Sequence, residues 1–174
     1  MQLFIKHFTE LSTAELYAIL KARQDVFVVE QNCPFPEIDG KDLDAYHLWL
    51  ADENGIAAYA RVLDRGISFE EPAVGRVISL RRREGLGTRI LQEGMQVAAE
   101  KYGAEAVMLE AQVYARKLYE KQGFVQVSEE FLEDGIPHIV MRAELELIPF
   151  FSQQISPLRK LTQSRKKTPS QMTE

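Results

Sequence analysis

A basic turn with two glycines, residues 80–87, has the residue types needed to bind a phosphate group. Gly85 and Gly87 lack a Cβ atom, so an anion can approach the main chain closely there. Three consecutive arginines, 81–83, add positive charge, and Thr88 adds a hydroxyl donor. A helical pattern begins directly after the turn, and the first N–H groups of a helix have no partner within it. The segment therefore predicts a phosphate-binding turn at a helix N-terminus.

The turn departs from two widespread phosphate-binding motifs and matches a third. A P-loop requires a lysine after its last glycine, and here Thr88 follows Gly87. A dinucleotide fingerprint needs a further glycine, which this spacing lacks. Residues 82–87, RREGLG, fit the pattern [RQ]-x-x-G-x-[GA] instead. This pattern resembles the coenzyme A pyrophosphate motif of the GCN5-related N-acetyltransferases. For the hexamer alone, a glycine turn that only caps a helix is the alternative.

A second segment, residues 106–124, strengthens the resemblance. Its sequence predicts a strand over 107–112, a short helix over 115–121 that stops at Gly123, and a new strand from Phe124. This order is similar to the strand, helix and tyrosine signature of the same family. The matching positions in this chain are Gln112, Ala115 and Tyr119.

The resemblance extends over nearly all of residues 1–143 and narrows to the ElaA-type branch of that superfamily. It rests on VFVVEQNCPFPEIDGKD (26–42), AYARVL (58–63), GRV (75–77), AQ (111–112) and EDGIPHIVM (133–141). Between GRV and the arginines the chain is shorter than the usual pattern and lacks its frequent proline. The fold class that the resemblance implies is α+β, the GNAT fold. It has a mixed, mostly antiparallel central sheet with one splayed parallel strand pair, flanked by helices.

The resemblance also implies a co-substrate and a reaction. Acetyl-CoA supplies an acetyl group without a metal, and the acetyl group passes directly to a primary amine of a small molecule or a peptide. The implied cofactor-binding residues are Val77, Ile78, Ser79, Leu80, Arg82, Arg83, Glu84, Gly85, Leu86, Gly87, Thr88, Gln112 and Ala115. The alternative is a catalytically silent acyl-CoA-binding sensor or interaction module, because no general base is evident beside the phosphate-binding turn.

Acyl transfer to an amine needs one group that gives a proton and one that takes a proton. Tyr119 occupies the family's acid position, and a phenol with a pKa of about 10 can protonate a thiolate whose thiol has a pKa of about 8.5. A lysine-like amine with a pKa of about 10.4 is mostly protonated at neutral pH, so a base is needed. Glu30, in the VFVVEQ segment, and Glu110, on the same strand face as Gln112, are candidate bases. A chain of water molecules is an equal alternative.

The segment from Gln31 to Asp44 is a candidate acceptor-binding loop. It is interrupted by prolines and a glycine and is rich in carboxylates. In the family architecture this segment borders the acceptor side, so we expect its acidic residues to attract a protonated amine; a hydrated acidic loop is the alternative. The predicted substrate-binding residues are Glu37, Asp39, Asp42 and, in the GIPHI segment, His138.

The remaining patterns predict the order of the elements. Ser12 and Glu15 form a capping box that starts a helix running to Val28 or Glu30. Asn54-Gly55 predicts a hairpin turn. Arg61, within an apolar strand, requires a buried or acceptor-side partner. The expected strands are 2–8, 46–51, 56–63, 74–80, 107–112, 125–131 and 138–145, and a helix is expected over 86–102, ended by Gly103.

Length and composition predict one domain, residues 1–148, followed by a basic, disordered tail, residues 149–174. The tail holds five basic residues and one acid, so residues 1–148 are more acidic than the net charge of −5 for the whole chain indicates. An acidic body disfavours nucleic acid as a partner and favours cationic amines. No apolar run suits a membrane span or a signal peptide, so a cytoplasmic protein without a membrane partner is expected. The single Cys33 excludes an internal disulfide, and a homodimer is possible.

Overall fold

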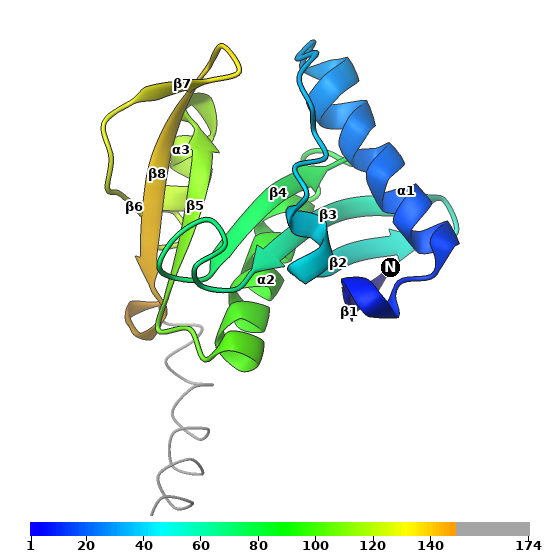
Figure 1. Ribbon diagram of the computed structural model, residues 1–174, viewed down its shortest axis with the longest axis horizontal. Helices are drawn as coiled ribbons and strands as arrows, with labels where there is room; N and C mark the ends of the chain where they lie inside the picture. Colours follow the sequence, from blue (N-terminus) through cyan, green and yellow to red (C-terminus); the bar gives the residue numbers. More distant parts are fainter. Residues whose placement is uncertain (149–174) are drawn as a thin grey trace, which may run out of the picture.

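A mixed sheet of eight strands organises residues 1–148, the part of the chain that the computed structural model describes (Figure 1). The strand order is β1-β2-β3-β4-β5-β8-β6, and β7 pairs with the first residues of β8, from Ile136 to His138. All neighbours are antiparallel except β4 and β5. The strands are β1 Gln2–His7, β2 Ala45–Asp52, β3 Gly55–Leu63, β4 Ala73–Ser79, β5 Ala106–Gln112, β6 Val125–Gln126, β7 Phe131–Glu133 and β8 Ile136–Glu144. The predicted fold class is confirmed.

The parallel pair β4–β5 is joined only at its beginning. Ala73 pairs with Met108, and the Met108 N–H donates to the Pro72 carbonyl at 3.0 Å. Beyond that point the two strands diverge, so that β1–β4 and β5–β8 separate toward one end of the molecule (Figure 1). From Val74 to Ser79, the edge of β4 that faces β5 therefore pairs with no strand of residues 1–148.

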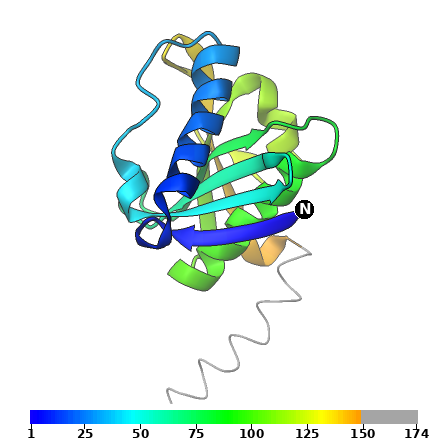
Figure 2. The same ribbon diagram turned by 90° about the vertical axis from the view of Figure 1, so that its right-hand side faces the viewer.

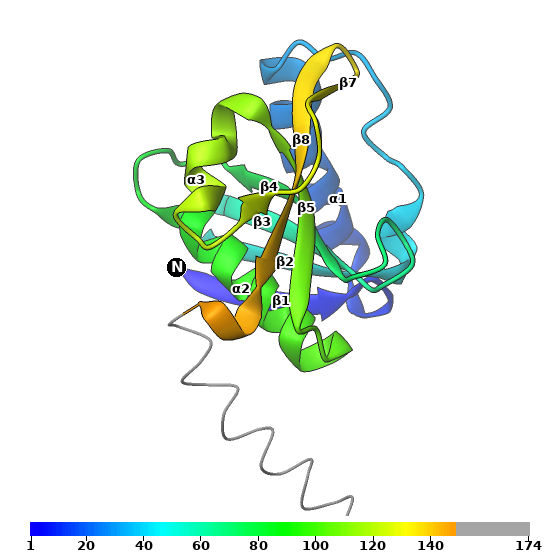
Figure 3. The same ribbon diagram turned by 90° about the vertical axis from the view of Figure 1, so that its left-hand side faces the viewer.

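Helices cover both faces of the sheet. α1, Thr13–Arg23, lies across one face, and α2, Leu86–Tyr102, and α3, Arg116–Glu120, lie on the other (Figures 2 and 3). α1 begins at the predicted capping box, in which the Ser12 N–H donates to Glu15 at 2.8 Å. It continues as a π-helical segment η2, Gln24–Glu30, and α2 ends at the predicted Gly103, which adopts φ 61°. The short 3-10 turns are η1 Phe8–Glu10, η3 Lys41–Asp44, η4 Val113–Ala115 and η5 Leu145–Leu147.

Two apolar clusters hold β3 and β4 rigidly between the helices. The cluster under α1 contains Ile19, Trp49, Tyr59 and Ile78. On the other face, α2 approaches β4 so closely that a Cβ on Gly94 would lie 2.9 Å from a methyl of Val74. This close contact explains the glycine in mid-helix, and it fixes the direction in which β4 enters the turn before α2.

The predicted strand over 125–131 is instead two short strands, β6 and β7, and the expectation of one continuous strand was wrong. Ser128 is responsible, because its Oγ accepts the N–H of Val140 at 2.8 Å and takes the place of a main-chain partner. Gln126 Nε2 also donates to the Ser128 carbonyl at 2.7 Å. The chain leaves the ladder at this point and rejoins it at Phe131.

The predicted basic tail, residues 149–174, lies outside the described residues. Within residues 1–148, none of the helices combines the length and the apolar character that crossing a membrane requires. The predicted cytoplasmic location and the possible homodimer stay predictions.

Candidate active site

The turn between β4 and α2 presents an open helix N-terminus. Gly85 is the N-cap residue with φ 74°, a left-handed conformation that a β-branched side chain would strain. The first helical bond runs from the Arg89 N–H to the Gly85 carbonyl at 3.1 Å, which leaves the N–H groups of Leu86, Gly87 and Thr88 without a helical acceptor. Among residues 1–148, no atom lies within 4 Å of the position that a Cβ of Gly85 would occupy. Free amides and open space fit the diphosphate of coenzyme A.

The three arginines of the turn differ in their partners. Arg81 forms two bonds to the Asp52 carboxylate, at 2.5 and 2.7 Å, and so fixes the turn to the end of β2. Arg82 is ion-paired with Glu30 at the end of η2. Arg83 is exposed, has φ 66°, and makes no ion pair within residues 1–148. Of the three arginines, Arg83 is therefore the one without an ion-pair partner among residues 1–148.

The predicted cofactor residues of β4 have side chains that are mostly packed or already hydrogen-bonded, and their role in cofactor binding stays a prediction. The Ile78 side chain is buried under α1, and Val77 packs against the larger core. The Ser79 hydroxyl donates to the Arg81 carbonyl at 2.8 Å, and the Leu80 N–H donates to the Ala57 carbonyl of β3. Glu84 and the side chain of Leu80 are exposed. The unpaired edge of β4 is thus the surface that pantetheine amides could use.

The end of β5 is joined to the segment after α1 by one hydrogen bond. Gln112 Nε2 donates to Gln31 Oε1 at 3.0 Å. Ala115 is partly buried at the start of α3 and packs against the core. Two consecutive residues therefore reach the two diverging strands. Glu30 contacts Arg82, in the turn after β4, and Gln31 contacts Gln112, at the end of β5.

Tyr119 is nearly buried but keeps a reachable hydroxyl. It is 9% exposed and packs edge-to-face with Phe124 at 6.1 Å. The Tyr119 oxygen makes no hydrogen bond within residues 1–148. It is not one of the fully buried side-chain atoms without a partner there, which are Asp42 Oδ2 and Arg61 Nε. Burial raises the pKa of Tyr119 to about 12, so the group stays protonated and can act only as an acid near neutral pH.

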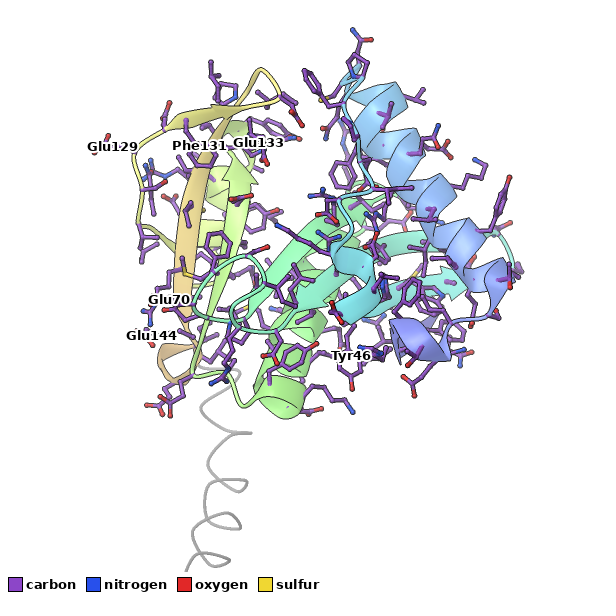
Figure 4. The ribbon with its side chains drawn as sticks, viewed as in Figure 1. Tyr46, Glu70, Glu129, Phe131, Glu133 and Glu144 are labelled. Atoms are coloured by element: carbon purple, nitrogen blue, oxygen red, sulfur yellow. The ribbon has the colours of Figure 1, made fainter. Side chains whose placement is uncertain are left out.

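Glu110, Gln112 and His138 share the face of β5 and β8 that α2 and α3 do not cover. His138 stands opposite Gln112, stacks on Phe131 with ring centroids 6.1 Å apart, and has its Nε2 3.7 Å from Glu133 Oε2. Figure 4 places Glu133 on the side of β7 turned toward α1 and Glu129 at the outer edge. This uncovered face thus brings together Glu110, Gln112 and His138, with Glu133 beside His138.

The two predicted base candidates are not equivalent. Glu30 is held by Arg82, whereas Glu110 forms no ion pair within residues 1–148. Desolvation of the carboxyl, together with the Glu133 carboxylate, raises the pKa of Glu110, while the charges of Lys41, His138 and Arg76 oppose that shift. A carboxyl with a raised pKa takes up a proton more readily, which favours Glu110 over Glu30 as the base.

The predicted acidic acceptor loop is already neutralised by arginines. Asp39 is paired bidentately with Arg61 at 2.6 and 2.7 Å, and Asp42 Oδ1 accepts from Arg23 at 2.6 Å and from Arg61 at 2.8 Å. Glu37 accepts from Arg23 at 2.9 Å. The expected partner of Arg61 is thus confirmed. An acceptor-binding role for Glu37, Asp39 and Asp42 stays a prediction, and the structure gives these residues a different role as anchors of the loop.

Sequence reasoning missed two members of this network, Arg23 and Arg76. Arg23 ends α1 with 0% of its side chain exposed, and it follows Ile19 by four residues on the buried face of the helix. Arg76 belongs to the GRV segment, which was noted only as part of a resemblance. For Arg76 the available signal was an arginine inside an apolar strand, as at position 61. For Arg23 it was a charged residue at helical spacing from the apolar Ile19 and Leu20. Within residues 1–148, no group of three or more His, Cys, Asp or Glu side chains is arranged to hold a metal ion.

An open helix N-terminus after β4, next to a parallel strand pair that diverges, is the architecture of the acyl-CoA N-acyltransferase fold. Residues 27–145 match the family model described as an acetyltransferase (GNAT) domain. The chain belongs to this GNAT acetyltransferase family, in its ElaA-type branch. The family predicted from sequence is confirmed.

Three comparisons document this membership. Protein ElaA of Escherichia coli strain K12 is 41% identical over 145 residues, which covers 80% of this chain and 94% of ElaA. The crystal structure of an acyl-CoA N-acyltransferase from Pseudomonas aeruginosa superposes with a TM-score of 0.77 at 40% identity and covers 82% of this chain and 99% of that one. The crystal structure of Escherichia coli ElaA gives a TM-score of 0.76 at 37% identity, with the same coverage.

Proposed function

We propose that this protein is an N-acetyltransferase that moves an acetyl group from acetyl-CoA directly to a primary amine of a small molecule or a peptide. Membership of an acetyltransferase family supports acyl transfer in general, and the Pseudomonas relative is described as an acyl-CoA N-acyltransferase. The observation that carries the proposal is the set of free amides at Leu86, Gly87 and Thr88, next to the unpaired edge of β4. A thioester co-substrate bound there supplies an activated acyl group.

The chain's own residues have three tasks in this reaction. The helix N-terminus and Arg83 hold the diphosphate, which converts an encounter of two molecules into an oriented one. Glu110 takes the proton that the ammonium nitrogen must lose before it can attack the thioester, and solvent takes the second nitrogen proton as the amide bond forms. Tyr119 gives its proton to the sulfur as the carbon–sulfur bond breaks, and solvent restores that proton. His138 and Glu133 lie beside Glu110 and contact the acceptor.

The decisive experiment combines coenzyme binding with turnover. We expect CoA to raise the melting temperature of the protein, and we expect continuous thiol release with at least one member of a panel of small amines, polyamines, amino sugars and lysine peptides. A CoA-induced shift without thiol release for any amine favours the silent acyl-CoA-binding module instead. Absence of both responses would contradict the proposal.

Gly85→Val provides the site-specific arm of this experiment. Valine strains the left-handed N-cap conformation, so the amides move and the CoA-induced thermal shift should disappear. Gly66→Val is the matched control, because Gly66 has φ 81° in the loop between β3 and β4 and lies outside the phosphate-binding turn. A CoA response retained in Gly85→Val, or lost equally in Gly66→Val, would place coenzyme binding elsewhere.

Tyr119→Phe tests the proposed acid. The variant keeps the ring contact with Phe124 and removes only the hydroxyl, so we expect kcat to fall about tenfold while the CoA-induced thermal shift stays unchanged. The loss should be smaller with an acyl donor whose leaving thiol is more acidic, because such a thiolate departs without help. Wild-type kcat in Tyr119→Phe would reject the assignment.

A further inference from the structure

Arg76 occupies a β-bulge in the strand edge where acyl transfer is proposed to occur. Tyr59 pairs with Ile78 and Arg61 pairs with Gly75, so that Arg76 and Val77 together face the single residue Ala60. Arg76 adopts φ 53°, a left-handed conformation that is uncommon for a residue with a side chain. Such a conformation persists only where surrounding contacts hold it.

The contacts that hold Arg76 all come from the segment between α1 and β2. Its Nε donates to Glu37 Oε1 at 2.8 Å, and its guanidinium also reaches the Glu37 carbonyl at 3.3 Å and Asp39 Oδ2 at 3.4 Å. The guanidinium carbon lies 5.8 Å from the centre of the Phe27 ring. The side chain therefore ties residues 27–39 to the bulge of β4.

Each carboxylate of the network keeps an arginine partner without Arg76. Glu37 keeps Arg23, and Asp39 keeps its bidentate partner Arg61, when Arg76 is removed. Arg23 and Arg61 are 0% and 4% exposed, whereas the Arg76 side chain is 31% exposed. A substitution at Arg76 thus leaves no carboxylate buried without a partner, and the fold should tolerate it.

The position of the bulge gives this contact a consequence for the reaction. It lies on the part of β4 whose β5-facing edge has no strand partner, and the strand continues directly into the phosphate-binding turn. The loop on the other end of the contact includes Lys41, whose charge opposes the raised pKa of Glu110 across the divergence. Arg76 thereby links the edge that would hold the thioester to the loop that borders the acceptor.

We propose that Arg76 is a positioning residue, which sets the β4 bulge and loop 31–44 at the mutual distance that acyl transfer requires. This inference rests on the proposed function for its kinetic consequences. Displacement of reacting groups by about 1 Å can slow a reaction by about a hundredfold. A positioning residue should therefore change kcat and leave coenzyme binding unchanged.

The test compares Arg76→Ala, Arg76→Gly and Arg76→Lys with the wild type and with Arg65→Ala, an exposed arginine outside the network. We expect kcat to fall about tenfold to a hundredfold in the alanine and glycine variants, with the CoA-induced thermal shift and the KM for acetyl-CoA unchanged. Arg76→Lys should recover part of kcat because it keeps one cationic donor for Glu37. Amide hydrogen exchange over residues 31–44 should quicken in the alanine and glycine variants only.

The glycine variant separates the side chain from the backbone. Glycine adopts φ 53° without strain, so wild-type kcat and exchange in Arg76→Gly would show that only backbone geometry matters and would overturn the proposal. A loss confined to the KM for acetyl-CoA would overturn it as well. If the wild type transfers no acetyl group to any amine, the proposed function fails, and the exchange over 31–44 still decides whether Arg76 holds the loop.

Discussion

Arg23→Ala is expected to lower the free energy of unfolding by about 3–5 kcal/mol, because it removes one partner from a buried ion-pair network. Arg23 has no exposed side-chain surface and donates to Glu37 and Asp42 at distances of 2.6–2.9 Å. Its loss leaves Glu37 with Arg76 alone and Asp42 with Arg61 alone, in surroundings that water reaches poorly. Denaturant unfolding followed by circular dichroism measures the change.

Two comparison variants make this expectation specific. Lys21→Ala removes an exposed pair with Asp25 in the same helix, and we expect a change of less than about 1 kcal/mol. Arg23→Lys keeps the charge but not the planar fork, so its stability should lie between that of the wild type and Arg23→Ala. If Arg23→Ala were as stable as Lys21→Ala, the network would not be the main anchor of the loop.

The buried network also shows how the loop and the sheet depend on each other. His47 lies behind the network, and its Nε2 donates to the Asp42 carbonyl at 3.1 Å. Because a carbonyl can only accept, the proton of the neutral ring is on Nε2, and Nδ1 accepts from the Tyr59 hydroxyl at 2.8 Å. Burial lowers the pKa of His47, so the ring stays neutral beside two arginines. The polar groups behind the loop are thereby connected from β2 to β4.

Local signals predicted most of the fold. The capping box at Ser12, the Asn54-Gly55 turn and the helix stop at Gly103 each depend on residues a few positions apart, and each is confirmed. The interruption of the strand after Gln126 depends on a hydroxyl that competes for a distant N–H, which periodicity does not detect.

The site was predictable where a motif is contiguous and not where charges meet from distant segments. The turn at 80–87 was located correctly as a helix N-terminus because its residues are adjacent in sequence. The pairing of Arg82 with Glu30, by contrast, joins residues 52 positions apart. The acidic loop looked like an amine-binding surface because nothing local indicates that arginines from α1, β3 and β4 meet it.

Glu110→Gln should have a larger effect on turnover than Tyr119→Phe, because the two protons differ in how much the reaction depends on them. A thiolate can depart unprotonated, whereas an amine that keeps its proton has no lone pair with which to attack. Bringing a lysine-like amine to its neutral form at pH 7 costs about 4.6 kcal/mol. We expect kcat/KM to fall about a hundredfold in Glu110→Gln.

The pH profile distinguishes this role from simple charge attraction. Glu110 acts as a base only when ionised, and its pKa is raised above the ordinary 4.5, so kcat/KM of the wild type should rise with pH through that raised value. Glu110→Gln should lose that acidic limb, and Glu129→Gln, at the outer edge of the sheet in Figure 4, should keep it. If Glu110→Gln raised only the KM for the amine and kept the acidic limb, Glu110 would bind the acceptor and the base would lie elsewhere.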